Sequence, residues 1–384
     1  PLGRIDRLPD GTPLGTLREW DACDLLLRAS PQHPPEALRQ ALGEACGRQN
    51  LVGVTWMQDA WVDQAGHQPY LELAERNALT VRSNLAFRAD PTTWRDQLES
   101  FQRMRAEVEA LGLPEMLTAR TVKFFADGVI ESATGAMLEP YVGTTDRGMA
   151  VWQPTELTEA VTYFDAAGFQ THIHAIGDAA VRYALDAIEA ASRSNPVWDR
   201  RPVIAHVQVV HPADLRRFAA LGVTANFESY WSQDDPLQSR LTTPRLGPQR
   251  AAQQYPAASL VRSGAVISHG SDWPVSTNNP LEAMRVAITR LNDAGQPANG
   301  WIPTERLTIT EALAAATSGS AYQAWTDSFR GKLTLGMYAD LVIYDDDLLA
   351  LEPSQWRQIT PRSTWLAGRP VAGVGSVVSS VVTG

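Results

Sequence analysis

The chain has 384 residues, of which 44% are hydrophobic and 20% charged, and its formal net charge is −10. This length exceeds that of a usual single domain, so we expect one large domain with an appendage. The acidic balance argues against non-specific binding to nucleic acid or to anionic membranes, because both require basic patches. No apolar run reaches the roughly 20 residues of a membrane span.

The cysteine content and the first residue bear on the compartment. Cys23 and Cys46 are too few for a disulfide framework, which favours a reducing compartment and hence the cytoplasm. The sequence begins with Pro1 and not Met, so we expect a processed or partial sequence. A signal peptide upstream of Pro1 is therefore left open.

Strand and helix patterns alternate along most of the chain. Residues 1–30 begin with turn-forming residues and run into an amphipathic helix, and a second helix follows Pro31. The predicted strands are residues 51–58, 79–87, 118–126, 169–175, 202–208, 222–229 and 264–271. The predicted helices between them include residues 91–111, 155–167, 178–192 and 212–220. Such alternation predicts a parallel sheet of βαβ units, one strand short of an eight-stranded barrel.

The pattern changes near residue 325. Residues 326–384 hold the Gly-punctuated segments GKLTLGMYADLVIYDDD and STWLAGRPVAG, without a helical pattern between them. We therefore predict a barrel domain over residues 1–325 and a small β domain over 326–384. Residues 291–304 are expected to form a surface loop.

Four side chains that could bind a metal or take part in catalysis lie at or near the carboxyl ends of four predicted strands. They are Lys123 in VKFFADG, His174 in THIHAIGD, His206 in VIAHVQ and Asp272 in SHGSDWPV. Active sites of (β/α)₈ barrels are built at the carboxyl ends of the strands. Imidazole and carboxylate are ligands for zinc and related divalent ions. Asp272 could also accept a proton from bound water.

Other readings of these histidines and of Asp272 stay open. His172 and His174 share one face of their strand, and a buried pair satisfied by the backbone is an equal alternative. Asp272 could be an Asx-turn residue. We expect His211 to be a cap or a loop residue, with contact to substrate as a minor alternative, and His269 to be a structural neighbour or to support a ligand.

Lys123 is the least expected member of the set, because a lysine in an apolar strand is costly unless it is paired or altered. Burial could lower its pKa and make it a neutral nucleophile, as in a Schiff-base lyase. Reaction with CO₂ would instead give a carbamate that can bridge metal ions. An ion pair with Asp127 or Glu131 is the simplest alternative.

These segments together resemble the amidohydrolase superfamily, and most closely its family 3, which includes YtcJ-like hydrolases and N-substituted formamide deformylase-like proteins. The phrases that carry the resemblance are VKFFADG, HIHAIGDAAVRYALDAI, IAHVQVVHPADLRRFAALGV, GSDWPVSTNNPLEAMRVAITR and GKLTLGMYADLVIYD. They cover nearly all of residues 1–370.

The resemblance implies an α/β fold, a TIM-like (β/α)₈ barrel, beside part of a β-sandwich. It implies that Lys123, His174, His206 and Asp272 are the contributions of barrel strands 4, 5, 6 and 8 to a site for one or two divalent ions, usually Zn²⁺. The metal would activate water against an amide carbonyl, with Asp272 as the base and proton shuttle.

The chain departs from the family pattern in three places. The family's first barrel strand carries a His-x-His pair, and no such pair precedes Lys123. The first half of the family's β-sandwich is missing as well. We therefore expect a fragment that lacks the first strand, with a degenerate barrel as the alternative. Gln58 stands where many relatives carry His, and we expect it to tune the pocket.

Trp56, Tyr230, Trp231 and Trp273 are candidates for substrate binding, because they lie in segments expected near the site. They would suit an apolar or aromatic acyl or amine group, and packing under loops is an equal alternative. We predict a metal-dependent hydrolase of a non-peptide C–N bond in a small molecule, such as an N-substituted amide or formamide. The alternative is an inactive barrel that binds or regulates. We expect no nucleic-acid or membrane partner, and a homodimer is left open.

Overall fold

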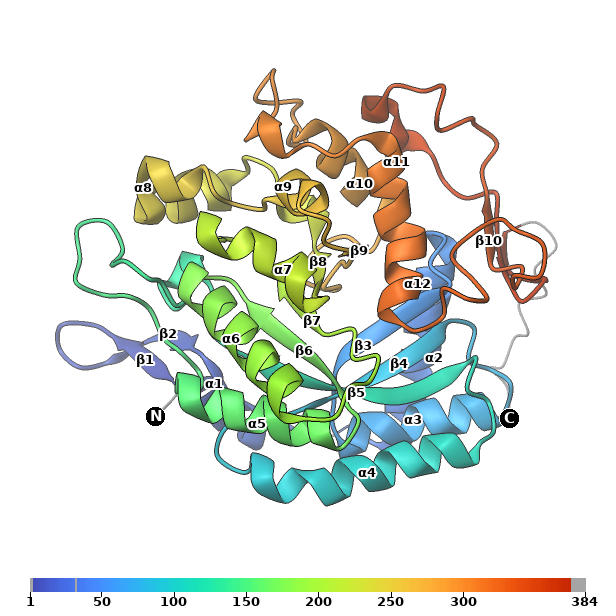
Figure 1. Cartoon of the computed structure of the whole chain (residues 1–384), viewed down its shortest axis with the longest axis horizontal. Helices are drawn as coiled ribbons and strands as arrows, with labels where there is room; N and C mark the ends of the chain where they lie inside the picture. The colour runs from blue at the N-terminus through green and yellow to red at the C-terminus, as the bar shows by residue number, and fades with distance from the viewer. Residues whose placement is uncertain (1–2, 32, 374–384) are drawn as a thin grey trace.

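The computed structural model describes residues 3–31 and 33–373. Its centre is a seven-stranded parallel sheet in which each strand pairs with the next one along the chain. The strands are β3 (Trp56–Val62), β4 (Arg82–Arg88), β5 (Leu117–Phe125), β6 (Gln170–Ala175), β7 (Val203–His206), β8 (Thr224–Phe227) and β9 (Ile267–His269). Figure 1 shows the sheet curling into a half-barrel with helices on its outer side. The predicted α/β barrel-like fold is confirmed.

Helices lie between most of the strands, as the alternating pattern predicts. The helices are α1 (Trp20–Ala29), α2 (Pro35–Leu51), α3 (Gln64–Glu75), α4 (Trp94–Ala110), α5 (Pro154–Ala166), α6 (Asp178–Ser194), α7 (Leu215–Leu221), α8 (Thr243–Ala251), α9 (Ala257–Arg262), α10 (Pro280–Thr289), α11 (Ile309–Ala314) and α12 (Ser320–Gln323). In α6, Val181, Ala184, Leu185 and Ile188 are buried at helical spacing, which forms the stripe that packs on the sheet. None of the described helices is long and apolar enough to span a membrane.

The first predicted strand began too early. Residues predicted as strand from position 51 onward include the end of α2 and a turn, and β3 begins only at Trp56. Gly53 has φ 90°, a left-handed conformation that glycine adopts easily and that lets the chain leave the helix. Residues 51–54 thus form the end of α2 and the turn after it, and Leu51 is 64% exposed.

The N-terminal segment contains a β-hairpin that the sequence analysis did not predict. Strands β1 (Arg4–Arg7) and β2 (Pro13–Arg18) pair antiparallel ahead of the expected helix α1. The Asp10-Gly11 step, with Gly11 at φ 88°, supplies the turn, and this dipeptide is a known hairpin signal. Arg18 fastens the hairpin to the loop after β5 by donating to the carbonyl oxygen of Ser132 at 2.6 Å.

The parallel sheet is open between its outer strands β3 and β9, and a glutamine joins the two. Gln323 of α12 donates through Nε2 to Oε1 of Gln58 on β3 at 2.8 Å. Its Oε1 accepts from the Ser268 hydroxyl on β9 at 2.5 Å. This buried side chain is hydrogen-bonded to both strands. It therefore bridges β3 and β9 across the gap, where the described residues form no further strand.

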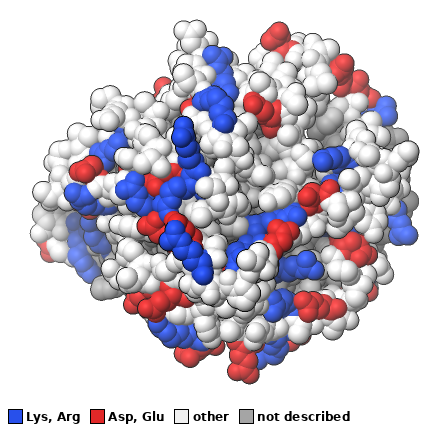
Figure 2. All heavy atoms as spheres, in the orientation of Figure 1, with Lys and Arg blue, Asp and Glu red and all other residues white. Residues whose placement is uncertain are grey.

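A second sheet follows the half-barrel. Strands β10 (Leu341–Ile343), β11 (Ser363–Leu366) and β12 (Arg369–Gly373) form an antiparallel sheet. A buried ion pair between Arg82 on β4 and Asp340, with N–O 2.7 Å, ties this sheet to the half-barrel. The last residues of the predicted β domain, 374–384, lie outside the described part of the chain. On the face seen in Figure 2, positive and negative side chains are interspersed with uncharged surface.

Candidate functional site

Successive side chains of strand β5 point alternately to the helix-covered core and to the interior of the half-barrel, where the candidate site lies. Val122 and Phe124 are fully buried and pack towards the helices, where Phe124 lies 6.0 Å from Phe164 of α5 between ring centroids. Lys123 and Phe125 therefore face the interior of the half-barrel. Lys123 is 4% exposed, and its partner in the parallel register of β6 is His172.

Two of the predicted ligands, His174 at the end of β6 and His206 at the end of β7, lie side by side. Their ring centroids are 4.5 Å apart in an edge-to-face arrangement, and both side chains are nearly buried. His206 has φ 73°, a left-handed conformation that is unusual outside glycine and that recurs at functional sites. The carboxyl ends of these strands thus bring two imidazoles together as predicted from their positions.

Each of the two rings is held through one nitrogen only. Nδ1 of His206 donates to Oε2 of Glu228 at 2.8 Å, and Nε2 of His174 donates to the carbonyl oxygen of Gly128 at 3.1 Å. Within the described residues, the other nitrogen of each ring has no hydrogen bond. Histidines that bind metals usually have this arrangement, with the second nitrogen held by a carboxylate or a carbonyl.

Asp127 is a carboxylate of the site that the sequence analysis considered only as an ion-pair partner. Its oxygens accept from the backbone N–H groups of Ala136, Ile176 and Gly177 at 2.8–3.0 Å. Its Oδ1 also lies 3.5 Å from Nε2 of His174. Asp127 therefore fixes the loop after β5 against the end of β6, and the ADG step after a strand was the available signal.

Glu228 was missed altogether, although it follows directly after the apolar strand β8. It is 3% exposed, and burial raises its pKa to about 7 despite the positive charge of Lys123 nearby. Its Oε2 is hydrogen-bonded to Nδ1 of His206, so Glu228 orients that ring.

Lys123 has none of the ion pairs considered for it. Glu131 instead accepts from the Thr242 hydroxyl at 2.7 Å, and Asp127 is held by backbone N–H groups. Burial lowers the pKa of Lys123 to about 8, while the charges of Asp272 and Glu228 oppose this shift. At neutral pH a useful fraction of the amine is therefore unprotonated and nucleophilic.

Asp272 lies in the loop after β9, exposed and with φ 50°. Its charge acts on the pKa values of both Lys123 and His206, which places its carboxylate in the same electrostatic neighbourhood. The exposure fits a group at the mouth of the half-barrel that exchanges protons with water.

His172 lies below this group in the interior. Nε2 of Gln58 donates to Nδ1 of His172 at 2.7 Å, so the ring carries its proton on Nε2. That Nε2 is buried and has no hydrogen-bond partner among the described residues. Burial lowers the pKa of His172 well below its usual value, and the charges of Lys123 and His206 lower it further.

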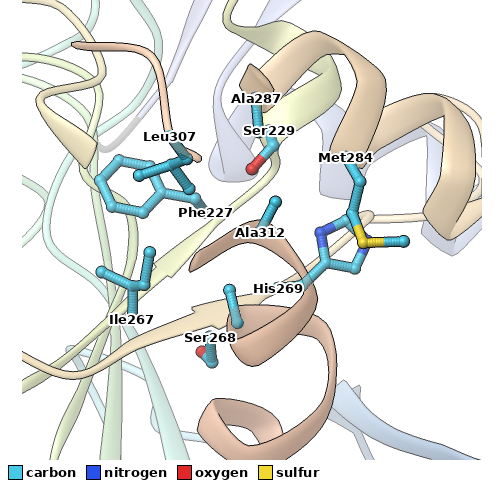
Figure 3. Close-up of a pocket in the computed structure, with 10 residues that line it drawn as sticks. Phe227, Ser229, Ile267, Ser268, His269, Met284, Ala287, Leu307 and Ala312 are labelled. Carbon is cyan, nitrogen blue, oxygen red and sulfur yellow. The ribbon is translucent and has the colours of Figure 1, made fainter. Parts of the chain in front are cut away.

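His269 faces away from the site, whereas His211 acts as a cap. Figure 3 shows the His269 ring beside Met284 of α10, in a cavity of about 10 Å³ that is large enough for one water. Burial lowers the pKa of His269 to about 4. The His211 side chain accepts from the N–H of Ala213 at 3.2 Å, which confirms the predicted cap.

The four aromatic candidates do not gather in one place. The Trp231 ring stacks on His206 with centroids 5.4 Å apart and planes 9° apart. Trp273 follows Asp272 in the same loop, and Tyr230 donates to Asp293 at 3.2 Å. Trp56 begins β3, at the opposite end of the strand from the site, and lies under Arg330.

The donor set fits a metal in part. The two imidazole rings lie 4.5 Å apart between centroids, and within the described residues one nitrogen of each ring has no hydrogen bond. Within the described residues, however, no three His, Cys, Asp or Glu side chains gather closely enough to hold an ion by themselves. A metal at this position needs a donor of another kind, and Lys123 lies against the same Phe125 ring as His174, with Nζ 5.0 Å and the His174 ring 5.3 Å from its centroid.

Comparisons with known proteins agree with this architecture. The model of the amidohydrolase family matches residues 1–372. The chain is 32% identical over 355 residues to the Arabidopsis thaliana protein LONG AFTER FAR-RED 3, covering 89% of this chain and 58% of that protein. It is 26% identical over 377 residues to the N-substituted formamide deformylase of Arthrobacter pascens, covering 95% and 66%.

The fold is also found among solved structures. An uncharacterized metal-dependent hydrolase from Pyrococcus furiosus superposes with a TM-score of 0.70 at 21% identity, covering 91% of this chain and 68% of that one. The chain thus spans about two thirds or less of these three proteins. Because the family model covers nearly the whole chain, the protein belongs to the amidohydrolase family.

Proposed function

We propose that the protein hydrolyses a non-peptide C–N bond of a small molecule, such as an amide or formamide, with the help of a divalent metal ion. The observation that carries the proposal is the pair His174 and His206, each held through one nitrogen while the other has no hydrogen bond in the described part of the chain. Family membership and the relative named as a formamide deformylase support the reaction class.

The metal would be held by His174, His206, Lys123 and Asp272. Imidazole nitrogen is a ligand for zinc and its neighbours among the divalent metals, and burial holds the pKa of His206 well below its usual range, which keeps that ring neutral. When bound, the ion would supply Lewis acidity and a water that ionises near neutral pH.

Lys123 would join the site as a carbamate. Its unprotonated amine attacks CO₂, a new N–C bond forms, and the released proton passes to solvent, which leaves an anionic oxygen ligand. The pKa of about 8 keeps part of the amine in the reactive form. The buried Nε2–H of His172 offers a hydrogen bond on the neighbouring strand.

The remaining side chains orient the ligands and move protons. Glu228 fixes the ring of His206, and Gly128 fixes that of His174. Asp272 would accept the proton of the attacking water and return it to the leaving amine nitrogen. Trp231 would close one side of the pocket by its stack on His206.

Hydrolysis of a panel of N-substituted formamides and amides, before and after removal of metal by a chelator, tests the proposal. We expect amine release that stops after chelation and returns with added Zn²⁺. The variant Lys123→Met should lose this activity, and borohydride with a carbonyl substrate should not label Lys123. Amine release that resists chelation, or covalent labelling of Lys123, would contradict the proposal.

A second candidate is an inactive barrel with a binding role. It is favoured by the finding that the described residues hold no group of three His, Cys, Asp or Glu ligands. A chain that retains no zinc and releases no amine from any member of the panel would support this candidate over the hydrolase.

A further inference from the structure

An aromatic wall lies directly beside the candidate ligands, and none of its members was predicted as a site residue. Its members are Trp20 at the start of α1, Trp61 near the end of β3, and Phe125 at the end of β5. Phe125 is the hub: its ring lies 5.2 Å from Trp20, 5.4 Å from Trp61 and 5.3 Å from the ring of His174, between centroids. Nζ of Lys123 lies 5.0 Å from the same ring.

Arg88 is held on this wall. Its guanidinium carbon lies 4.7 Å from the Trp61 ring and 5.2 Å from the Trp20 ring. Arg88 ends β4 and is the register partner of Lys123, so both side chains leave the sheet on the same face. Two indoles therefore hold a permanent positive charge beside the proposed reaction centre.

The donors of Arg88 are unused within the described residues. No hydrogen bond from its guanidinium is formed there, and its nearest carboxylate oxygen, on Asp90, is 3.9 Å away. Oδ1 of Asp90 accepts from the N–H and hydroxyl of Thr92 at 2.8 and 2.5 Å, and its Oδ2 is the oxygen that lies 3.9 Å from Arg88. A planar guanidinium with free donors is suited to binding a carboxylate through two parallel hydrogen bonds.

The hairpin completes the wall. Trp20 follows β2, and Arg18 at the end of β2 is hydrogen-bonded to the carbonyl oxygen of Ser132. The carboxylate of Glu19 lies so close to Gly128 that a Cβ atom on residue 128 would clash with it. Gly128 is the residue whose carbonyl holds His174. Trp61 remains 37% exposed, so apolar surface is open at the mouth.

We propose that this wall is the specificity subsite of the hydrolase, taking a substrate with a carboxylate, bound by Arg88, next to an apolar or aromatic group, bound by Trp20, Trp61 and Phe125. The inference rests on the proposed function, because the bound molecule is a substrate only if the protein is a hydrolase. The binding itself requires neither metal nor turnover. An N-acyl amino acid, or another amide with a carboxylate near its scissile bond, has this chemistry.

Calorimetric titration of the chelator-treated chain with two matched probes tests the proposal. The probes are 3-phenylpropanoate and its uncharged analogue 3-phenylpropanamide. We expect the acid to bind about 10- to 100-fold more tightly than the amide, as for a hydrogen-bonded charge pair. Equal binding of the two probes, or binding of neither, overturns the proposal.

Variants locate the effect. Arg88→Gln should weaken binding of the acid about 10- to 100-fold and leave binding of the amide unchanged, which also shows that the variant is folded. Trp61→Leu should weaken both probes. The matched control Arg120→Gln removes an exposed arginine from the amino-terminal half of β5 and should change neither. If Arg120→Gln weakened binding of the acid as much as Arg88→Gln does, the assignment of Arg88 as the carboxylate-binding residue would be overturned.

Because metal is absent and no product is measured, these titrations separate the two proposals. A chain without metal or amide hydrolysis that still discriminates the acid through Arg88 would refute the proposed function and keep the subsite. An active hydrolase whose binding of the probes does not change in Arg88→Gln would support the proposed function and refute the subsite.

Discussion

Two regions of the half-barrel interior use polar side chains in opposite ways. At the open edge between β3 and β9, the amide of Gln323 is satisfied at both ends, by Gln58 and by Ser268. At the ends of β6 and β7, His174 and His206 are hydrogen-bonded through one nitrogen, and among the described residues the other nitrogen has no partner. A polar group that the protein satisfies completely supports the fold, whereas one that it orients and leaves open is prepared for a ligand.

The largest effect should come from the open side of this comparison. Asp272→Asn keeps the shape of the side chain but cannot take a proton, so we expect kcat to fall by about 10²–10⁴-fold. The free energy of unfolding should change by less than about 0.5 kcal/mol, because Asp272 is exposed. Steady-state kinetics and denaturant unfolding measure both, with Asp346→Asn as the exposed control. An active Asp272→Asn enzyme would remove Asp272 from the chemistry.

The closed side should show the opposite pattern. Gln323→Ala leaves the acceptor of Gln58 and the hydroxyl of Ser268 without their buried partner, and should lower the free energy of unfolding by roughly 2–4 kcal/mol. Zinc affinity of the folded variant should stay within about threefold of the parent, since ligand rings are untouched. Loss of zinc without loss of stability would reverse the roles assigned to the two regions.

Glu228 tests whether orientation matters on the open side. Glu228→Gln keeps an oxygen near Nδ1 of His206 but removes the carboxylate, and we expect zinc affinity to fall about 10–100-fold. Competition with a chromogenic chelator measures the change. An unchanged affinity would show that His206 does not use Glu228 to present its other nitrogen.

The smallest effect concerns a buried histidine with neither nitrogen hydrogen-bonded within the described residues, His67. Burial lowers its pKa below the usual 6.5, so the unfolded chain binds the proton more tightly. Its contribution to stability is complete above pH 6.5 and is lost as the pH falls through the lowered pKa. His67→Leu should therefore show a shallower decline of unfolding free energy below pH 6.5 than the parent does. Parallel curves would contradict this.

Local patterns were sufficient to locate the strands β4 to β9 of the parallel sheet, but they missed the hairpin β1–β2 and placed the start of β3 too early. Apolar runs that give way to Gly, Asp or a polar turn marked β5 to β9, and Lys123, His174 and His206 lie near three of these ends. The structure places these three in one electrostatic neighbourhood with Asp272.

What escaped prediction depends on register and on distant contacts. Arg88 acquires its place only because β4 pairs with β5 in the register that sets it beside Lys123. Gln323 meets Gln58 across 265 positions of sequence, a contact that periodicity cannot reveal. Trp56 and Trp61 lie at opposite ends of the same strand, β3. Residue type alone therefore could not show which of the two tryptophans lies near the site.

The central claim is that His174 and His206 form a metal site, and zinc stoichiometry tests it most directly. The chelator-treated chain would be reloaded with Zn²⁺, desalted and measured by plasma emission, beside His206→Ala and the control His67→Leu. We predict one or two ions per chain for the parent and for His67→Leu, and a loss of at least one ion for His206→Ala. Equal zinc in the parent and in His206→Ala would contradict the site.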